Sequence, residues 1–205
     1  PANFAGDLDV RVRAYDGEWT AEDVFTLTIT PAPVTVSVAH DNTLSLVPTG
    51  WTWLADNGHI YKYVSGDTTW TNAVTSAANQ IAGVSYLATV TSAAEDGLID
   101  ALLGSSGRTY LGGSDAGTEG TWTWLTGPEA GTVFWQGNSS GSAVNGAFTD
   151  WSSGQPSVTD PTGDEDYLAT DLSSRWNDVV NNNTSLDIGY TAEAGAPSAT
   201  YAAIN

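Results

Sequence analysis

The second half of the chain has little of the patterning that marks regular helices and strands. From Gly104 onward the sequence is rich in Gly, Trp and turn residues, and short strands are expected at 108–111, 167–170 and 186–192. A loop region of this length is uncommon in a compact domain unless it has a function or is held by an ion. Because the chain contains no Cys, disulfides cannot hold the region in place.

The charge of the chain favours a bound cation as the means of holding these loops. Among 205 residues, 24 are acidic and five are basic, which gives a formal net charge of -19. Nucleic acid is not expected as a partner, because binding phosphates requires clustered Lys and Arg. No apolar run approaches the ~20 residues of a membrane span, so membrane insertion is not expected either. Divalent cations are the obvious way for such a chain to offset its acidic charge.

Residues 1–33 alternate between apolar and polar positions with the period of half-buried β-strands. Strands are expected at 7–15 and 24–30, on either side of a turn signal at Asp16-Gly17. The pattern LxVxVxAxDG…AxDxFTLTIT resembles the closing strands of cadherin-like, immunoglobulin-type repeats. So few strands cannot close a sandwich, so we expect a partial sandwich that other parts of a longer chain, or a tail at 194–205 that pairs back, would complete.

The middle of the chain changes from β-structure to a mixed pattern. Residues 34–56 are expected to form a strand at 34–38 and then a connector that carries Trp51 and Trp53. Beyond it, apolar spacing and capping residues predict two helices and two strands. These are a strand at 59–64, a helix at 70–81 with an N-cap at Asp67-Thr68, a strand at 86–90, and a helix that starts at a Ser92–Glu95 capping box and ends at Gly104.

Six short motifs then follow one another in a fixed order. They are YLGGSD at 110–115, EGTWTW at 119–124, WSSGQPS at 151–157, DEDYL at 164–168, WND at 176–178 and GYTAE at 189–193. In this order they resemble the motifs of the C-type lectin-like domain, over about residues 57–193. The resemblance implies an α+β fold with two helices, short antiparallel strands and a long loop region held by Ca²⁺, preceded by the N-terminal all-β partial sandwich.

The resemblance also implies a set of Ca²⁺ ligands in the loop region. The matching side chains are Gln155, Ser157, Glu165, Asn177 and Asp178. Pro156 is expected to be a cis-proline that turns its two neighbours toward the same ion. Oxygen donors of this kind suit Ca²⁺, which takes ~6–8 of them. In such lectins two coordination positions are filled by oxygens of the ligand, so the ion itself recognises the ligand.

Further residues are weaker candidates for this site. Asp160, Asp164 and Asp166 are candidates for additional metal ligands, and Trp151 is a candidate for ligand contact because it leads into the loop. His59 is expected to be a surface or strand residue without a role at the ion. The other Trp residues of the motifs are expected to fill an irregular core rather than to stack on sugars.

Two features depart from the family pattern. Ser157 stands where the family has Asn or Asp, and Tyr167 stands where it has a disulfide Cys. The motif-matched side chains supply two negative charges, from Glu165 and Asp178, where sugar-binding members supply three. If no further Asp contributes, surplus positive charge at the ion favours an anionic ligand such as a peptide carboxylate. Equal affinity for a free peptide C-terminus and its amide would contradict that hypothesis.

The function expected from these features is recognition rather than catalysis. No Cys nucleophile is present and His59 has no companion motif, so an enzyme is not expected. A cadherin-like repeat followed by this domain is similar to the ligand-binding region of large bacterial RTX adhesins. That resemblance implies a Ca²⁺-dependent module at the bacterial cell surface, monomeric in isolation, which captures a glycan or a carboxylate-bearing peptide terminus for cell adhesion or biofilm formation.

Two alternatives remain open from the sequence. In the first, the acidic segment is only a solvated loop, as runs of charged residues usually are. In the second, Ca²⁺ stiffens the loop of a structural spacer that has no ligand of its own.

Overall fold

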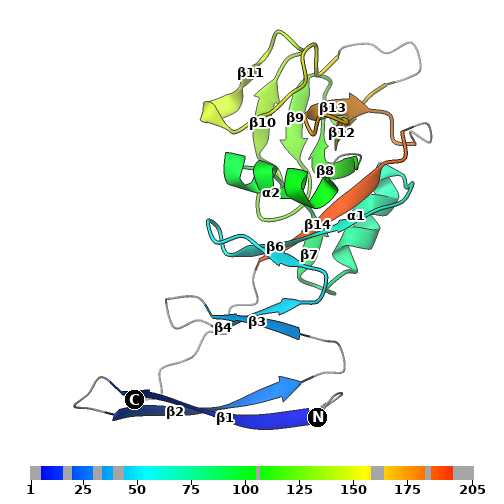
Figure 1. Ribbon diagram of the computed structural model, residues 1–205. Helices are drawn as coiled ribbons and strands as arrows, with labels where there is room; N and C mark the ends of the chain where they lie inside the picture. Colours follow the sequence, from blue (N-terminus) through cyan, green and yellow to red (C-terminus); the bar gives the residue numbers. More distant parts are fainter. Residues whose placement is uncertain are drawn as a thin grey trace.

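The computed structural model describes residues 6–15, 20–29, 34–38, 44–104, 107–157, 164–182 and 186–195. Within these residues the strands form three sheets, of which two are antiparallel pairs and the third has ten strands. Figure 1 shows the two pairs near the N-terminus, and the large sheet with the helices in the rest of the molecule.

The two small sheets contain the N-terminal strands. β1 (Gly6–Tyr15) pairs with β2 (Thr20–Ile29), which confirms the two strands expected there, although β2 begins earlier than the pattern indicates. β3 (Val34–Val38) confirms the next expected strand and pairs with β4 (Leu44–Pro48), which the sequence does not indicate. That these strands close a cadherin-like sandwich stays a prediction.

The large sheet holds the remaining strands. Its order is β11-β10-β9-β8-β14-β6-β5, with β12 paired to both β8 and β13, and β7 paired to β14. The bounds are β5 Thr52–Trp53, β6 His59–Val64, β7 Ser85–Leu87, β8 Thr109–Ser114, β9 Thr121–Trp124, β10 Val133–Gln136, β11 Ser142–Ala143, β12 Tyr167–Thr170, β13 Trp176–Val179 and β14 Gly189–Gly195. A 3₁₀ turn, Val144–Gly146, follows β11. The sheet is mixed rather than antiparallel throughout, because β14 runs parallel to β8.

The last described strand lies in the centre of this sheet. β14 is antiparallel to β6 and β7, and Gly195 at its end lies opposite His59 at the start of β6. The first residues of the tail expected at 194–205 therefore belong to this sheet. The residues after Gly195 lie outside the described part, so their pairing with the N-terminal strands stays a prediction, as does the division of the chain into domains.

The first helix is shorter than its apolar spacing suggests. α1 spans Trp70–Ala78, and its N-cap is Thr69, whose hydroxyl accepts a hydrogen bond from the backbone N–H of Asn72 at 3.1 Å. The expected N-cap at Asp67-Thr68 is therefore wrong by one residue. In the turn that follows the helix, the backbone N–H of Gln80 and the hydroxyl of Ser85 both donate to the carbonyl of Ala77, at 3.2 and 2.6 Å.

The second helix begins and ends where the sequence indicates. α2 spans Ala93–Leu103, and the Ser92 hydroxyl accepts from the backbone N–H of Glu95. The Glu95 carboxylate in turn accepts a hydrogen bond, at 2.8 Å, from the backbone N–H of Thr91, one residue before the N-cap. Gly104 ends the helix with φ of +65°, a conformation that Gly adopts at little cost.

Aromatic rings form the core of the half that lacks long strands and helices. Trp124 stacks on Phe134 with ring centroids 4.3 Å apart, and Trp176 meets Trp124 edge-on at 5.9 Å. Trp122, Trp124, Phe134 and Trp176 are almost completely buried. Packed aromatic rings combine large buried area with specific geometry, so this cluster supports the loops around it, as expected for the motif tryptophans.

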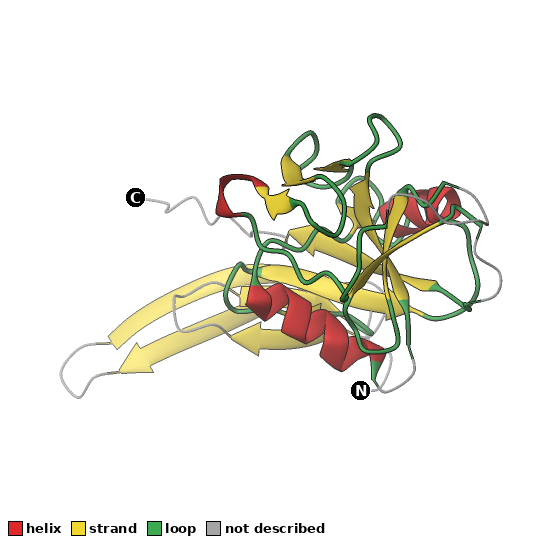
Figure 2. Cartoon of the chain, turned by 90° about the horizontal axis from the view of Figure 1, so that it is seen from above, coloured by secondary structure: helices red, strands yellow, loops and turns green. Residues whose placement is uncertain are grey.

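The helices flank the strands without approaching the length of a membrane span. Figure 2 shows α1 and α2 at separate places with strands of the large sheet drawn between them. Neither helix, nor any other helical segment among the described residues, is long and apolar enough to cross a bilayer.

Candidate functional site

The loop that contains Gln155 is fixed to β13 by backbone hydrogen bonds. The N–H of Ser152 donates to the carbonyl of Trp176 at 2.8 Å, and the N–H of Trp176 donates to the carbonyl of Asp150 at 2.9 Å. The peptide bond between Gln155 and Pro156 is cis, and Pro156 is buried. This anchoring places Gln155 and Ser157 beside the strand that carries Asn177 and Asp178.

Ser157 connects the two carboxylates of the proposed ligand set. Its backbone N–H donates to Oδ2 of Asp178 at 2.6 Å, and its hydroxyl lies 3.1 Å from the same oxygen. The hydroxyl also lies 3.2 Å from Oε2 of Glu165. Two carboxylates with like charge therefore converge on one small side chain. Such convergence costs energy unless positive charge offsets it.

Two buried oxygens at this loop have no hydrogen-bond donor among the described residues. They are Oδ1 of Asp178 and Oε1 of Gln155. Asp178 is only 1% exposed, and burial raises its pKa to about 6. Unsatisfied buried acceptors are rare because each loses its hydration without replacement. A bound cation is one kind of partner that can satisfy a buried oxygen of this kind.

The chemistry of the donors fits a hard cation. The amide of Gln155, the hydroxyl of Ser157 and the carboxylates of Glu165 and Asp178 all offer oxygen, and neither Cys nor His is among them. Oxygen-only sets suit Ca²⁺ better than zinc or copper. Asn177 faces the same hollow as Gln155. The structure thus gathers the motif-matched side chains around one loop.

The additional Asp candidates separate into different places. Asp160 lies outside the described residues, and Asp164 is exposed. Asp166 belongs to a second acidic cluster with Asp115 and Glu119, in which carboxylate oxygens lie within 4.8 Å of one another. Acidic clusters of this kind are typical of the calcium sites of lectins.

The second cluster also contains an unsatisfied buried oxygen. Asp115 is 4% exposed, and no described residue donates to its Oδ1. Burial raises its pKa to about 7. Asp115 and Glu119 are not among the site residues that the sequence indicates. Their spacing of four residues across the turn after β8 is the one local sign of a site. Their partner Asp166 comes from a distant segment, through the pairing of β12 with β8.

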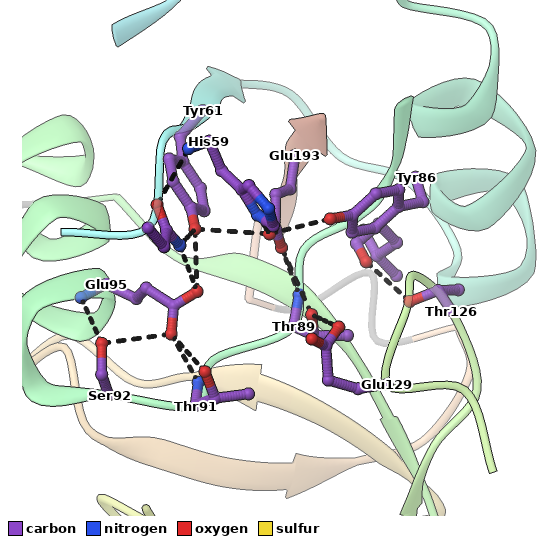
Figure 3. A network of polar contacts seen from close by, with 12 residues as sticks. His59, Tyr61, Tyr86, Thr89, Thr91, Ser92, Glu95, Thr126, Glu129 and Glu193 are labelled. Carbon is purple, nitrogen blue, oxygen red and sulfur yellow. Dashed lines mark hydrogen bonds and ion pairs between the residues drawn. The ribbon is translucent and has the colours of Figure 1, made fainter. Parts of the chain in front are cut away.

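A third set of acids comes from α2 and β14, and Figure 3 shows the polar contacts of Glu95 and Glu193. Glu193 is 1% exposed and Glu95 is 4% exposed. The hydroxyl of Tyr61 donates to Glu95 at 2.8 Å and that of Tyr86 donates to Glu193 at 2.9 Å. His59 lies 2.5 Å from Glu193, and this hydrogen bond raises the pKa of the imidazole despite partial burial. His59 is thus a strand residue, as expected, and also an ion-pair partner.

Comparison with known proteins gives one sequence relative and many structures of similar fold. No protein-family model matches the chain. Halomucin from Haloquadratum walsbyi is 38% identical over 145 residues, which are 69% of this chain and 2% of halomucin. The chain therefore spans only a small part of that relative.

Solved structures resemble the described fold more completely. The mouse scavenger receptor C-type lectin carbohydrate-recognition domain superposes with a TM-score of 0.55 at 19% identity, covering 74% of this chain and 98% of that domain. The cow CD23 carbohydrate-recognition domain, solved in the presence of a GlcNAc2Man3 oligosaccharide, gives a TM-score of 0.56 at 17% identity with the same coverage. The chain therefore has the α+β C-type lectin-like fold, with two helices and a mixed sheet.

Proposed function

We propose that this domain binds a glycan through a Ca²⁺ ion held at the loop site. The proposed ligands are Gln155, Ser157, Glu165, Asn177 and Asp178. The observation that carries the proposal is the pair of buried oxygens without described donors, on Gln155 and Asp178. The contacts of Ser157 support it, because they bring Glu165 and Asp178 together.

Glycan is favoured as the ligand class by the fold and by coordination chemistry. One similar carbohydrate-recognition domain was solved in the presence of an oligosaccharide. Vicinal hydroxyl groups of a sugar can complete the shell of a cation whose protein ligands leave positions open. The role is recognition rather than catalysis.

A carboxylate-bearing peptide terminus is the second candidate ligand. Its support is that Glu165 and Asp178 are the two carboxylates that meet at Ser157, so they balance the two charges of Ca²⁺ without the excess negative charge that a third carboxylate would add. A free peptide C-terminus would then bind more tightly than its amide. Equal affinity would exclude this candidate.

The biological setting is proposed to be a large adhesin outside the cell. Similarity to a short part of halomucin, a very long protein, supports a module within a larger chain. That relative is archaeal, so the expected bacterial source is not required by the similarity. Extracellular Ca²⁺ would fill even a weak site.

Replacing Asn177 and Asp178 together by Ala tests the function. Binding to a glycan array in Ca²⁺, with chelator as the reference, should disappear in this variant and persist in a control that changes the exposed Asn182 to Ala and Asp187 to Asn. If the wild type captures nothing in Ca²⁺ and the variant loses only thermal stability, the domain is a Ca²⁺-stiffened spacer instead.

A further inference from the structure

An open hollow lies directly beside the proposed Ca²⁺ site. It measures about 710 Å³, and Trp151, Gln155, Asp171, Arg175 and Asn177 are among its lining residues. A neighbouring hollow of about 410 Å³ shares three of these residues and adds Asp150. Small-molecule sites are roughly 300–1,000 Å³ in volume. The space therefore exceeds what the ion's own coordination positions require.

Polar groups of the two hollows form hydrogen bonds with one another and with nearby backbone and side chains. Nη1 of Arg175 donates to Oδ1 of Asp150 at 2.6 Å. Asp171 accepts from the backbone N–H of Ser173 at 2.7 Å and contacts the hydroxyl of Ser152. Although burial acts in the opposite direction, these hydrogen bonds hold the pKa of Asp171 below its usual value. Groups already fixed before binding lose little entropy when a ligand arrives.

The charges of the hollow suit a neutral ligand. Asp150 and Asp171 outnumber Arg175, and the whole chain carries -19, so an acidic ligand would be repelled outside the ion's reach. Donor and acceptor groups stand side by side on Arg175 and Asp150. Sugar hydroxyls both donate and accept, and therefore match such a pair. Half-buried Trp151 adds apolar surface for a sugar ring.

We propose that these two adjoining hollows together form a subsite for the second sugar of a neutral oligosaccharide whose first sugar is held at the ion. Arg175 and Asp150 determine specificity for the second sugar, and Trp151 supports its ring. The inference rests on the function proposed above, and it names the ligand class as an extended neutral glycan rather than a single sugar or an acidic chain.

Arg175→Met is the central test. Wild type and variant are applied in Ca²⁺ to an array of neutral mono-, di- and trisaccharides, with sialylated, uronic and sulfated glycans beside them. The wild type should bind some neutral oligosaccharides at least about tenfold more tightly than their terminal monosaccharides, and the variant should lose this gain while keeping its affinity for the monosaccharides. One hydrogen bond to a charged group corresponds to roughly a tenfold to hundredfold change in affinity.

Two further variants make the result specific. Lys62→Met also removes one positive charge, but from β6, where Lys62 donates a hydrogen bond to Gln80 and does not line the hollows. This control variant should bind glycans as the wild type does. Asp150→Asn should reproduce the loss seen with Arg175→Met. Calorimetry with Ca²⁺ alone should give the same affinity for all these proteins, which shows that the ion site and the fold are intact.

The outcomes separate the subsite from the proposed function. If monosaccharides bind in Ca²⁺ without any gain from a second sugar, or if Lys62→Met loses the gain equally, the subsite is wrong and the function stands. Tighter binding of the acidic glycans would also overturn the subsite. If no saccharide binds in Ca²⁺, the proposed function fails and the subsite fails with it.

Discussion

Glu193 and Asp178 are both 1% exposed, yet the protein satisfies them in opposite ways. Both oxygens of Glu193 have partners, among them Tyr86, the backbone N–H of Thr89, and His59. For Asp178, Ser157 donates to one oxygen, and the other has no donor among the described residues. Both carboxylate oxygens of Glu193 therefore have hydrogen-bond partners within the protein, whereas among the described residues only one oxygen of Asp178 has a donor.

The difference indicates which buried acid has a structural role and which a binding role. A buried carboxylate costs little when protein donors replace its hydration, and costs several kcal/mol when they do not. The network at Glu193 can therefore hold β6, β14 and the start of α2 together without an ion. The group at Asp178 gains its missing partner only when a cation binds.

Replacing each acid by its amide should separate the two roles most clearly. Asp178→Asn should weaken Ca²⁺ binding by about a hundredfold or more, since it removes a charged ligand. Glu193→Gln should instead lower the free energy of unfolding by roughly 2–4 kcal/mol, because hydroxyl and N–H donors lose a charged acceptor. Calorimetry with Ca²⁺ and denaturant unfolding measure the two effects. Loss of Ca²⁺ affinity in Glu193→Gln alone would reverse the two roles.

Removing Ca²⁺ with a chelator should affect the site at Asp178 and not the network at Glu193. At a free Ca²⁺ concentration about a hundred times the dissociation constant, a single site adds about 2.7 kcal/mol of stability. For a chain of this size that corresponds to roughly 5–10 °C in Tm. Thermal unfolding with Ca²⁺ and with chelator should show this shift in the wild type and in Glu193→Gln. It should be reduced in Asp178→Asn, and an undiminished shift there would place the stabilising ion elsewhere.

The cluster of Asp115, Glu119 and Asp166 offers a third case, since Asp115 also has an oxygen without a described donor. By the same reasoning Asp115→Asn should lower the number of bound Ca²⁺ ions by one. Calorimetric stoichiometry measures this, with Asp187→Asn, an exposed acid, as the control. An unchanged stoichiometry would show that an unsatisfied oxygen is not sufficient to mark a site.

The smallest expected effect is the pH dependence of the hydrogen-bond network around Glu193. Glu193 is hydrogen-bonded to His59, with Glu95 and Glu129 also facing it, and the pKa of His59 is raised. The ion pair therefore contributes its full stability below about pH 6.5, the ordinary pKa of His, and loses it as the pH rises through the raised value. His59→Gln should cost roughly 1–2 kcal/mol in acid and less in alkali.

Unfolding measured across this pH range, at constant Ca²⁺, tests the assignment. His40→Gln controls for the second histidine of the chain. A cost for His59→Gln that is independent of pH would mean that the contact with Glu193 is a neutral hydrogen bond.

Features set by neighbours in the chain could be predicted from the sequence. The capping bond between Ser92 and Glu95 and the stop at Gly104 depend on residues a few positions apart, and both were found where the pattern places them. Short strands such as β10 and β13 carry too few residues for a clear period-two signal. Their existence depends on partners elsewhere in the sheet.

The same limit applies to the sites. The order and identity of the motifs predict that Gln155, Ser157 and Asp178 belong to one site, because the family resemblance implies contacts that their spacing in the sequence does not indicate. The ion pair of His59 with Glu193 depends on the register of β6 and β14, which no local pattern encodes. A single sequence therefore shows which residues are available for a site more readily than which of them meet.

The pairing of β6 with β14 has a consequence for any long chain that contains this fold. Gly195 lies opposite His59, and Cα partners on antiparallel strands are about 5 Å apart. The segment from His59 to Gly195 therefore begins and ends at nearly the same place, and it adds very little to the end-to-end distance of a chain that contains it. Most of its residues lie to one side of the line that continues the chain through His59 and Gly195. Figure 1 shows β12 and β13 away from this junction, so the candidate site beside β13 lies at a distance from the place where the two ends of the segment meet.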